Sequence, residues 1–253
     1  MKLHPRLSLV ALALAATALL APARAADSGF KSIFNGKDLS GWEGNARFWT
    51  VRDGAITGQT KNEADLPANT FLVWKGGEPA NFELRLSFRL TGENDRKQAN
   101  SGVQYRSKVL DAATFVVGGY QADLDSPFRY TGMLYEEKGR GILMTTGEKV
   151  RIGATTETMD SKNKKKKKTD VEKLGIATST ADVQAAYKLG EWNELRLVAK
   201  GNHLQHYING KLTADVIDTD AKHGAKSGVI AFQLHRGPPM TVQFKDVQLK
   251  TLP

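Results

Sequence analysis

NFELRLSFRL, at residues 81–90, alternates apolar and polar side chains more regularly than any other part of the chain. Successive side chains of a β-strand point to opposite faces, so this pattern predicts a strand with one buried face. The residues that form that face are Phe82, Leu84, Leu86, Phe88 and Leu90. A strand of this kind needs a second layer of structure to pack against.

Strand patterns continue on both sides of this segment, and glycine turns separate them. Asp53-Gly54 and Asn209-Gly210 are typical of hairpin turns. No segment sustains a 3.6-residue apolar repeat, and no internal repeat of fixed period is visible, which argues against a propeller. We therefore expect an all-β sandwich or jelly roll of two antiparallel sheets. We expect a hairpin at residues 48–56 and further strands at 70–74, 192–199, 203–208, 211–216, 228–235 and 241–249.

The first 25 residues have the pattern of a secretory signal. Lys2 and Arg6 precede the apolar run Leu7 to Leu20, and Ala23-Arg24-Ala25 has the form of a signal-peptidase site. The run is shorter than the roughly 20 residues that a membrane span needs. We expect cleavage after Ala25 and a periplasmic or secreted protein, and the absence of cysteine excludes disulfides.

The basic charge of the chain is local. Loss of Lys2, Arg6 and Arg24 with the signal would take the formal net charge from +9 to +6, and six lysines between 162 and 168 account for that remainder. A run of this kind predicts a solvated surface loop, here about 155–180, or less often a contact with a polyanion or a membrane surface. No aromatic residue interleaves with the lysines, which disfavours nucleic acid as a partner.

Three expected strands each carry one apolar and one hydrogen-bonding face. The hydrogen-bonding faces hold Gln104 with Arg106, Gln121 with Asp123 and Asp125, and Gln233 with His235. If the strands share a sheet, these side chains form a candidate site.

The motifs, taken in order, resemble the 3-keto-disaccharide hydrolase domain family over roughly Gly29 to Leu252. The resemblance rests on FNGKDLSGW at 34–42, NFEL at 81–84, NSGVQYR at 100–106, GYQADLD at 119–125, TGMLY at 131–135, WNELR at 192–196, HYING at 206–210 and GVIAFQLHRG at 228–237. It implies a concanavalin-like jelly roll with a concave sheet that faces carbohydrate. It also implies 3-keto-glucoside 1,2-lyase and 3-keto-2-hydroxyglucal hydratase activity, linked to a sugar 3-dehydrogenase that makes the substrate. The lysine-rich segment Asn163 to Asp170 departs from the family pattern.

The chemistry of a 3-keto-glycoside requires a base, an acid and a group that stabilises an enolate. We expect Asp123 to act as the base, Arg106 to hold the enolate oxygen and His235 to move the proton to the leaving group. Arg106 paired with Asp123 as a structural ion pair, and His235 as a satisfied polar residue, are the alternatives. Asp125 is more typical of a turn residue.

The remaining candidates are expected to bind the sugar. Gln104, Gln121 and Gln233 are predicted to bind sugar hydroxyls, and Tyr135 to stack on the sugar or donate a proton. Hydrogen bonding at the sheet is the alternative for the glutamines. A divalent ion held by Asp123, His235 and a neighbour is possible, and a carbohydrate-binding module without catalysis is the alternative function.

Overall fold

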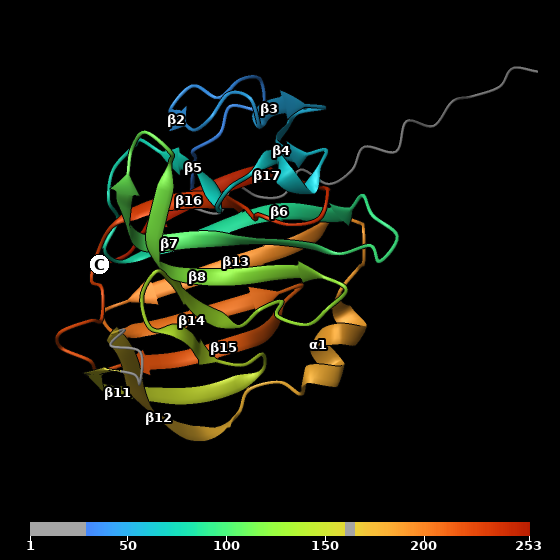
Figure 1. Ribbon diagram of the computed structural model, residues 1–253. Helices are drawn as coiled ribbons and strands as arrows, with labels where there is room; N and C mark the ends of the chain where they lie inside the picture. Colours follow the sequence, from blue (N-terminus) through green and yellow to red (C-terminus); the bar gives the residue numbers. More distant parts are fainter. Residues whose placement is uncertain (1–28, 160–164) are drawn as a thin grey trace, which may run out of the picture.

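The protein is a sandwich of two β-sheets that pack face to face (Figure 1). The computed structural model describes residues 29–159 and 165–253, so the expected signal peptide at 1–25 lies outside the described residues. Among the described pairs of strands, β11 with β15 is parallel and the others are antiparallel. The expected all-β jelly-roll class is confirmed.

The larger sheet has ten strands in the order β12-β11-β15-β14-β13-β6-β17-β4-β3, with β1 paired to β17. Their bounds are β1 Lys31–Ser32, β3 Trp49–Arg52, β4 Ala55–Thr60, β6 Phe82–Gly92, β11 Glu148–Met159, β12 Lys165–Ile176, β13 Asn193–Lys200, β14 His203–Ile208, β15 Lys211–Asp218 and β17 Met240–Thr251.

The smaller sheet has seven strands in the order β10-β9-β8-β7-β16-β5-β2. Their bounds are β2 Trp42–Glu43, β5 Thr70–Trp74, β7 Ala99–Asp111, β8 Val116–Ser126, β9 Leu134–Glu137, β10 Gly141–Met144 and β16 Val229–Leu234. The described part also contains the helix α1 (Thr180–Ala186) and a 3₁₀ turn at Glu63–Asp65. No helix among the described residues is long and apolar enough to cross a bilayer.

β6 lies between β13 and β17, at the centre of the larger sheet. Its five predicted apolar residues are at most 3% exposed and join the core between the sheets, which confirms the predicted buried face. From the smaller sheet, Tyr105, Tyr120, Leu124 and Phe232 pack into the same core. Because side chains alternate, the residues between them point to the outer face of the smaller sheet.

The three strands with polar faces adjoin in this sheet. β7 pairs with β8, so that Gln104 lies opposite Gln121, and β16 pairs with the other edge of β7. β8 also pairs with β9, which places Tyr135 opposite Gln121. The sheet order therefore brings the four polar faces together.

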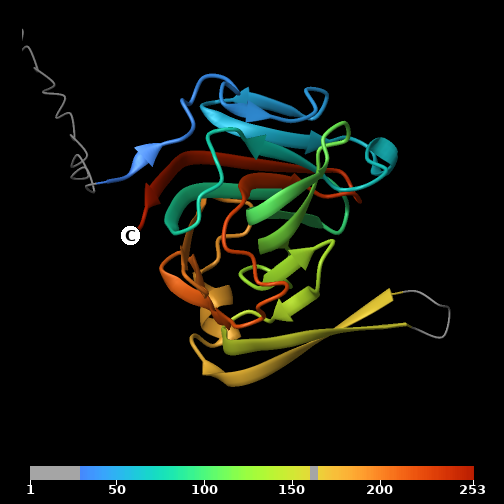
Figure 2. The same cartoon turned by 90° about the vertical axis from the view of Figure 1, so that its left-hand side faces the viewer.

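The expected surface loop at about 155–180 is wrong in its described part, because β11 and β12 form a long hairpin there and α1 follows it. β11 pairs with β15 only from Glu148 to Ile152, whereas its pairing with β12 continues to Met159. Beyond Ile152 the hairpin projects from the body as a two-stranded ribbon (Figure 2). The polar sequence of this segment is typical of a surface loop, but a two-stranded ribbon with both faces in solvent has an equally polar composition.

Candidate functional site

Polar side chains of adjoining strands form one hydrogen-bonded network on the outer face of the smaller sheet. Gln104 Nε2 donates to Gln121 Oε1 at 2.8 Å. Gln121 Nε2 donates to Asp123 Oδ1 at 2.5 Å and lies 3.4 Å from Gln233 Oε1. The glutamines are at most 1% exposed, and Asp123 is 4% exposed. The structure therefore brings together four predicted site residues in a recessed cluster.

Glu137 extends this network, although the sequence analysis did not select it. Gln233 Nε2 donates to Glu137 Oε2 at 3.2 Å, and Asn69 Nδ2 donates to the same oxygen at 3.3 Å. Glu137 lies two residues after Tyr135 on β9, so the alternation that places Tyr135 on this face also places Glu137 there. The site thus has two carboxyl groups, joined through Gln121 and Gln233.

The environment of the network favours neutral carboxyl groups. Burial raises the pKa of Asp123 to about 7, an effect that hydrogen bonds from two side-chain amides oppose. Burial also raises the pKa of Glu137. The pKa of the Tyr135 phenol is raised by burial and by the nearby charges of Glu137 and Asp123. The two carboxyl groups are therefore suited to proton transfer, while Tyr135 keeps its proton and can donate a hydrogen bond.

Gly102 makes room for the central side chain of the network. It lies opposite Asp123 in the β7–β8 pair. A Cβ atom on residue 102 would lie 2.4 Å from Cδ of Gln121, closer than carbon atoms approach each other. The glycine of the NSGVQYR motif therefore lets Gln121 lie across β7 and reach its partners.

A cavity of about 270 Å³ opens beside the network. Asn100 lines this cavity and donates from Nδ2 to Asp123 Oδ2 at 3.4 Å, so the cavity and the network meet at this residue. His235, which follows β16, is half-buried and lines the cavity. Burial lowers the pKa of His235 and favours its neutral form. The lining also includes Asp125, Arg129, Tyr130, Arg236 and Met240.

Asp125 holds a turn, as its sequence context suggested. Its Oδ1 accepts hydrogen bonds from the backbone N–H groups of Arg129, Tyr130 and Thr131 at 2.8, 2.6 and 3.1 Å. This bonding fixes the wall of the cavity that carries Tyr130. Burial nevertheless raises the pKa of Asp125.

Arg106 does not lie on the polar face, and its predicted catalytic role and its predicted ion pair with Asp123 are both wrong. The strict alternation fails because β7 has a bulge: its register with β8 shifts between Tyr105 and Lys108, and residue 106 has φ of 46°. The bulge turns the side chain of Arg106 away from Gln104.

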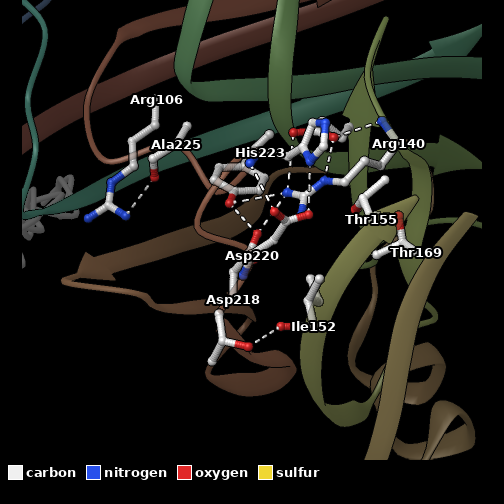
Figure 3. A network of polar contacts seen from close by, with 12 residues as sticks. Arg106, Arg140, Ile152, Thr155, Thr169, Asp218, Asp220, His223 and Ala225 are labelled. Carbon is white, nitrogen blue, oxygen red and sulfur yellow. Dashed lines mark hydrogen bonds and ion pairs between the residues drawn. The ribbon is translucent and has the colours of Figure 1, made fainter. Parts of the chain in front are cut away.

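The guanidinium of Arg106 instead binds backbone carbonyls of three loops. It donates to the oxygen of Ala80 at 2.6 and 2.8 Å, to that of Gly201 at 2.7 Å and to that of Ala225 at 3.3 Å. The contact with Ala225 is drawn in Figure 3. Arg106 is 1% exposed, so its role is to join these loops.

A second buried arginine supports the strand that carries Glu137. Arg140 Nε pairs with Glu136 at 2.7 Å, and its Nη2 pairs with Asp218 at 2.7 Å. Asp220 lies 3.6 Å from Nη1 and also bonds His223 (Figure 3). Although burial opposes it, the ion pairs raise the pKa of Arg140 and keep it charged. Glu136 is thus held on the inner side of β9, while Glu137 points outward.

No group of three or more His, Asp and Glu side chains within residues 29–159 and 165–253 is placed to hold a metal ion. The predicted possibility of an ion between Asp123, His235 and a neighbour therefore lacks a ligand set in the described structure.

Three crystal structures from Parabacteroides distasonis ATCC 8503, each provisionally assigned as a glycosyl hydrolase, have a similar fold. The first has 18% sequence identity and a TM-score of 0.53, and the match covers 88% of this chain and 99% of that one. The second has 17% identity and a TM-score of 0.51, with 89% and 94% covered. The third has 18% identity and a TM-score of 0.50, with 89% and 84% covered. Identities this low establish the fold alone.

No curated protein matches the chain significantly. A family model, by contrast, matches residues 29–250, nearly the whole chain. This match confirms the resemblance inferred from the motifs and supports a function in carbohydrate chemistry. The chain belongs to the family of the 3-keto-alpha-glucoside-1,2-lyase-like domain.

Proposed function

We propose that this protein cleaves glycosides whose sugar carries a ketone at C3. The observation that carries the proposal is the recessed pair of carboxyl groups, Asp123 and Glu137, joined by two glutamines beside Tyr135. Their raised pKa values suit groups that exchange protons near neutral pH. Family membership supports the substrate class.

The ketone determines the order of the steps. It acidifies the hydrogen on C2, so a base can remove that proton and leave an enolate. The enolate then forms a C1–C2 double bond, the bond from C1 to the leaving oxygen breaks, and an acid protonates that oxygen. Addition of water across the double bond returns a proton to C2 and puts a hydroxyl on C1. The net reaction is hydrolysis.

The described residues can supply each group. Asp123, with a pKa of about 7, has enough carboxylate at neutral pH to remove the C2 proton. Glu137, with its raised pKa, provides the acid for the leaving oxygen. Tyr135 remains a phenol and donates to the enolate oxygen, the role that we expected of Arg106. The amides of Gln104, Gln121 and Gln233 hold the two carboxyl groups in place and bind sugar hydroxyls.

The cavity beside Asn100 suits the leaving group. It adjoins Asp123 through Asn100 and has an aromatic wall at Tyr130, on which a second sugar ring can stack. His235 lines this cavity and is placed to bind the departing alcohol. The glycosyl hydrolase assignments of the P. distasonis proteins agree with this use of the fold.

We also propose that the chain is exported after cleavage at Ala25 and that a sugar 3-dehydrogenase supplies its substrate. An unoxidised glycoside lacks the acidic C2 hydrogen, so an oxidation must precede this reaction.

The test is to incubate the mature protein with a 3-keto-glucoside and with its unoxidised parent, and to follow the release of the leaving group. Cleavage of the keto substrate alone is the expected result. Cleavage of the unoxidised parent would instead indicate direct displacement by paired carboxylates. Saturable binding of both compounds without turnover would favour the alternative of a carbohydrate-binding module, in which the amide-rich network only holds the sugar.

A further inference from the structure

The ribbon formed by residues 153–159 and 165–169 has no partner in the larger sheet. Its two strands pair with each other, whereas β15 contacts β11 only up to Ile152. The side chains of residues 156–159 and 166–168 are exposed. An isolated two-stranded ribbon is marginally stable and contributes little to a core. Packing of the core therefore gives no reason for the chain to extend as this ribbon.

The ribbon carries a concentrated positive charge. Lys167 lies opposite Glu157, whose carboxylate is 3.7 Å from His223, while Lys166 and Lys168 point to the other face of the ribbon, opposite Thr158 and Thr156. No ion pair joins these three lysines to a carboxylate in the part of the chain that the structure describes. Unpaired ammonium groups on adjacent residues attract anions at short range.

The position of the ribbon relates this charge to the candidate site. β10, the edge strand of the smaller sheet, lies against both β11 and β12. In Figure 2 the outer face of the smaller sheet points to the right, and the ribbon extends in the same direction beyond that face. The exposed lysines of the ribbon, here called the basic wall, therefore lie past the β10 edge of the smaller sheet, on the side to which the polar face points.

We infer that this basic wall binds the acidic groups of an anionic glycan, carboxylates or sulfate esters, while one sugar of the same chain lies at the polar face. The inference rests on the proposed function, because the polar face must bind carbohydrate. A recessed, hydrogen-bonding site on the same side of the molecule as exposed lysines suits a ligand that is polar at one unit and charged at neighbouring units.

Edge protection is the competing explanation. β12 is an edge strand, and lysines on edge strands discourage pairing with other chains. Glutamates protect an edge equally well through charge but repel an anionic glycan. Charge reversal therefore separates the two explanations.

The experiment compares the mature wild-type protein with K166E/K167E/K168E, with K166Q/K167Q/K168Q and with the control K37E/K188E/K211E. The control reverses three exposed lysines outside the ribbon and gives the same change in net charge as the ribbon Glu variant. The probes are polygalacturonate for carboxylates, dextran sulfate for sulfate esters, and neutral dextran. Affinity is measured at low and at physiological salt, with thermal unfolding as the check on folding.

The inference predicts that the wild type and the control bind at least one acidic polymer roughly tenfold or more tightly than dextran, and that salt weakens this binding. Both ribbon variants should lose this preference while they unfold at the wild-type temperature. Preferential binding of polygalacturonate would identify carboxylates as the acidic groups, and preferential binding of dextran sulfate would identify sulfate esters. Unchanged binding of the acidic polymers in the Glu variant, or equal loss of binding in the control, would overturn the inference.

Turnover of a neutral 3-keto-glucoside should be the same in all four proteins. If none of the proteins turns it over, the proposed function fails whatever the polymers do. If all four do so but the ribbon variants still bind acidic polymers, only the inference about the ribbon fails.

Discussion

Asp123 and Glu137 lie at the two ends of one chain of amides, because Gln121 donates to the first, Gln233 donates to the second, and the two glutamines lie 3.4 Å apart. If these carboxyl groups are the base and the acid, D123N and E137Q should each lower kcat for a 3-keto-glucoside by about 10²- to 10⁴-fold. Both changes keep the side-chain shape, so KM should change little.

Steady-state kinetics with the keto substrate measure both effects. The matched control is E136Q, which changes the neighbouring carboxyl group on the inner side of β9. It should lower stability through the Arg140 network but leave kcat of the folded enzyme unchanged. Equal loss of kcat in E136Q would contradict the assignment of Glu137.

The raised pKa of Asp123 predicts opposite effects of pH on activity and on stability. The value of about 7 lies above the ordinary 3.8, so the folded state binds the proton more tightly than the unfolded chain does. The stability that this group contributes is therefore complete below pH 4 and is lost as the pH rises towards 7. Over the same range the Asp123 carboxylate forms, so kcat/KM should rise as the pH approaches 7 and fall again where Glu137, the proposed acid, loses its proton.

The variant D123N cannot titrate at residue 123, so it tests whether this group makes the wild type less stable as the pH rises. Between pH 4 and 8 its free energy of unfolding should rise relative to that of the wild type, by an amount on the order of a few kcal/mol. Chemical denaturation at several pH values measures the difference. A constant difference across this range would show that Asp123 has an ordinary pKa.

Gly102→Ala should disable the network without unfolding the protein. The backbone of residue 102 is not in the left-handed region, so the strain comes from the contact between the new Cβ and the side chain of Gln121. Displacing Gln121 removes a hydrogen bond that lowers the pKa of Asp123. We expect kcat to fall at least tenfold and the midpoint of the pH–activity profile to move upward.

G153A is the control for this change, because a Cβ at residue 153 meets its neighbours at an ordinary 3.4 Å or more. Its kinetics should match those of the wild type. A wild-type pH profile in G102A would mean that Gln121 does not influence Asp123.

Arg106→Ala should destabilise the fold and leave the chemistry intact. It removes charge-assisted hydrogen bonds to three carbonyl oxygens and the packing of a buried side chain, at a cost of roughly 3 kcal/mol. Thermal unfolding should show the loss, while kcat of the folded protein stays at the wild-type value. R106K keeps the charge but not the planar fork and should recover only part of the stability. If R106A had normal stability but no activity, Arg106 would have a role in catalysis after all.

The fold was predictable because its signal repeats along the chain. The apolar alternation in β6 identifies both the strand and its buried face, and the turns at Gly54 and Gly210 mark the hairpins β3–β4 and β14–β15. The polar face was predictable for the same reason, since Gln104, Gln121, Asp123 and Gln233 follow the two-residue period without interruption. Glu137 follows the same period on β9, one step after Tyr135, so the sequence pattern also places it on this face.

Arg106 was misplaced because a bulge is set by long-range contacts. The bulge changes the face of every later residue on β7, and no local residue marks where it falls. The hairpin of β11 and β12 could not be predicted from periodicity for a different reason. Both faces of its ribbon are solvated, so its sequence has no alternation of apolar and polar residues. Sequence periodicity therefore predicts faces only as far as the register remains regular.

The bonding of Arg106 resembles the way in which a bound cation gathers oxygen ligands. Its guanidinium takes carbonyl oxygens from the loops at Ala80, Gly201 and Ala225, and Asn81 adds a side-chain oxygen at 3.4 Å. A cation supplied by the chain itself is covalently tethered, so it cannot be diluted away or sequestered by a competing ligand. The loops at this end of the sandwich should therefore stay joined in media where the concentrations of free ions vary widely.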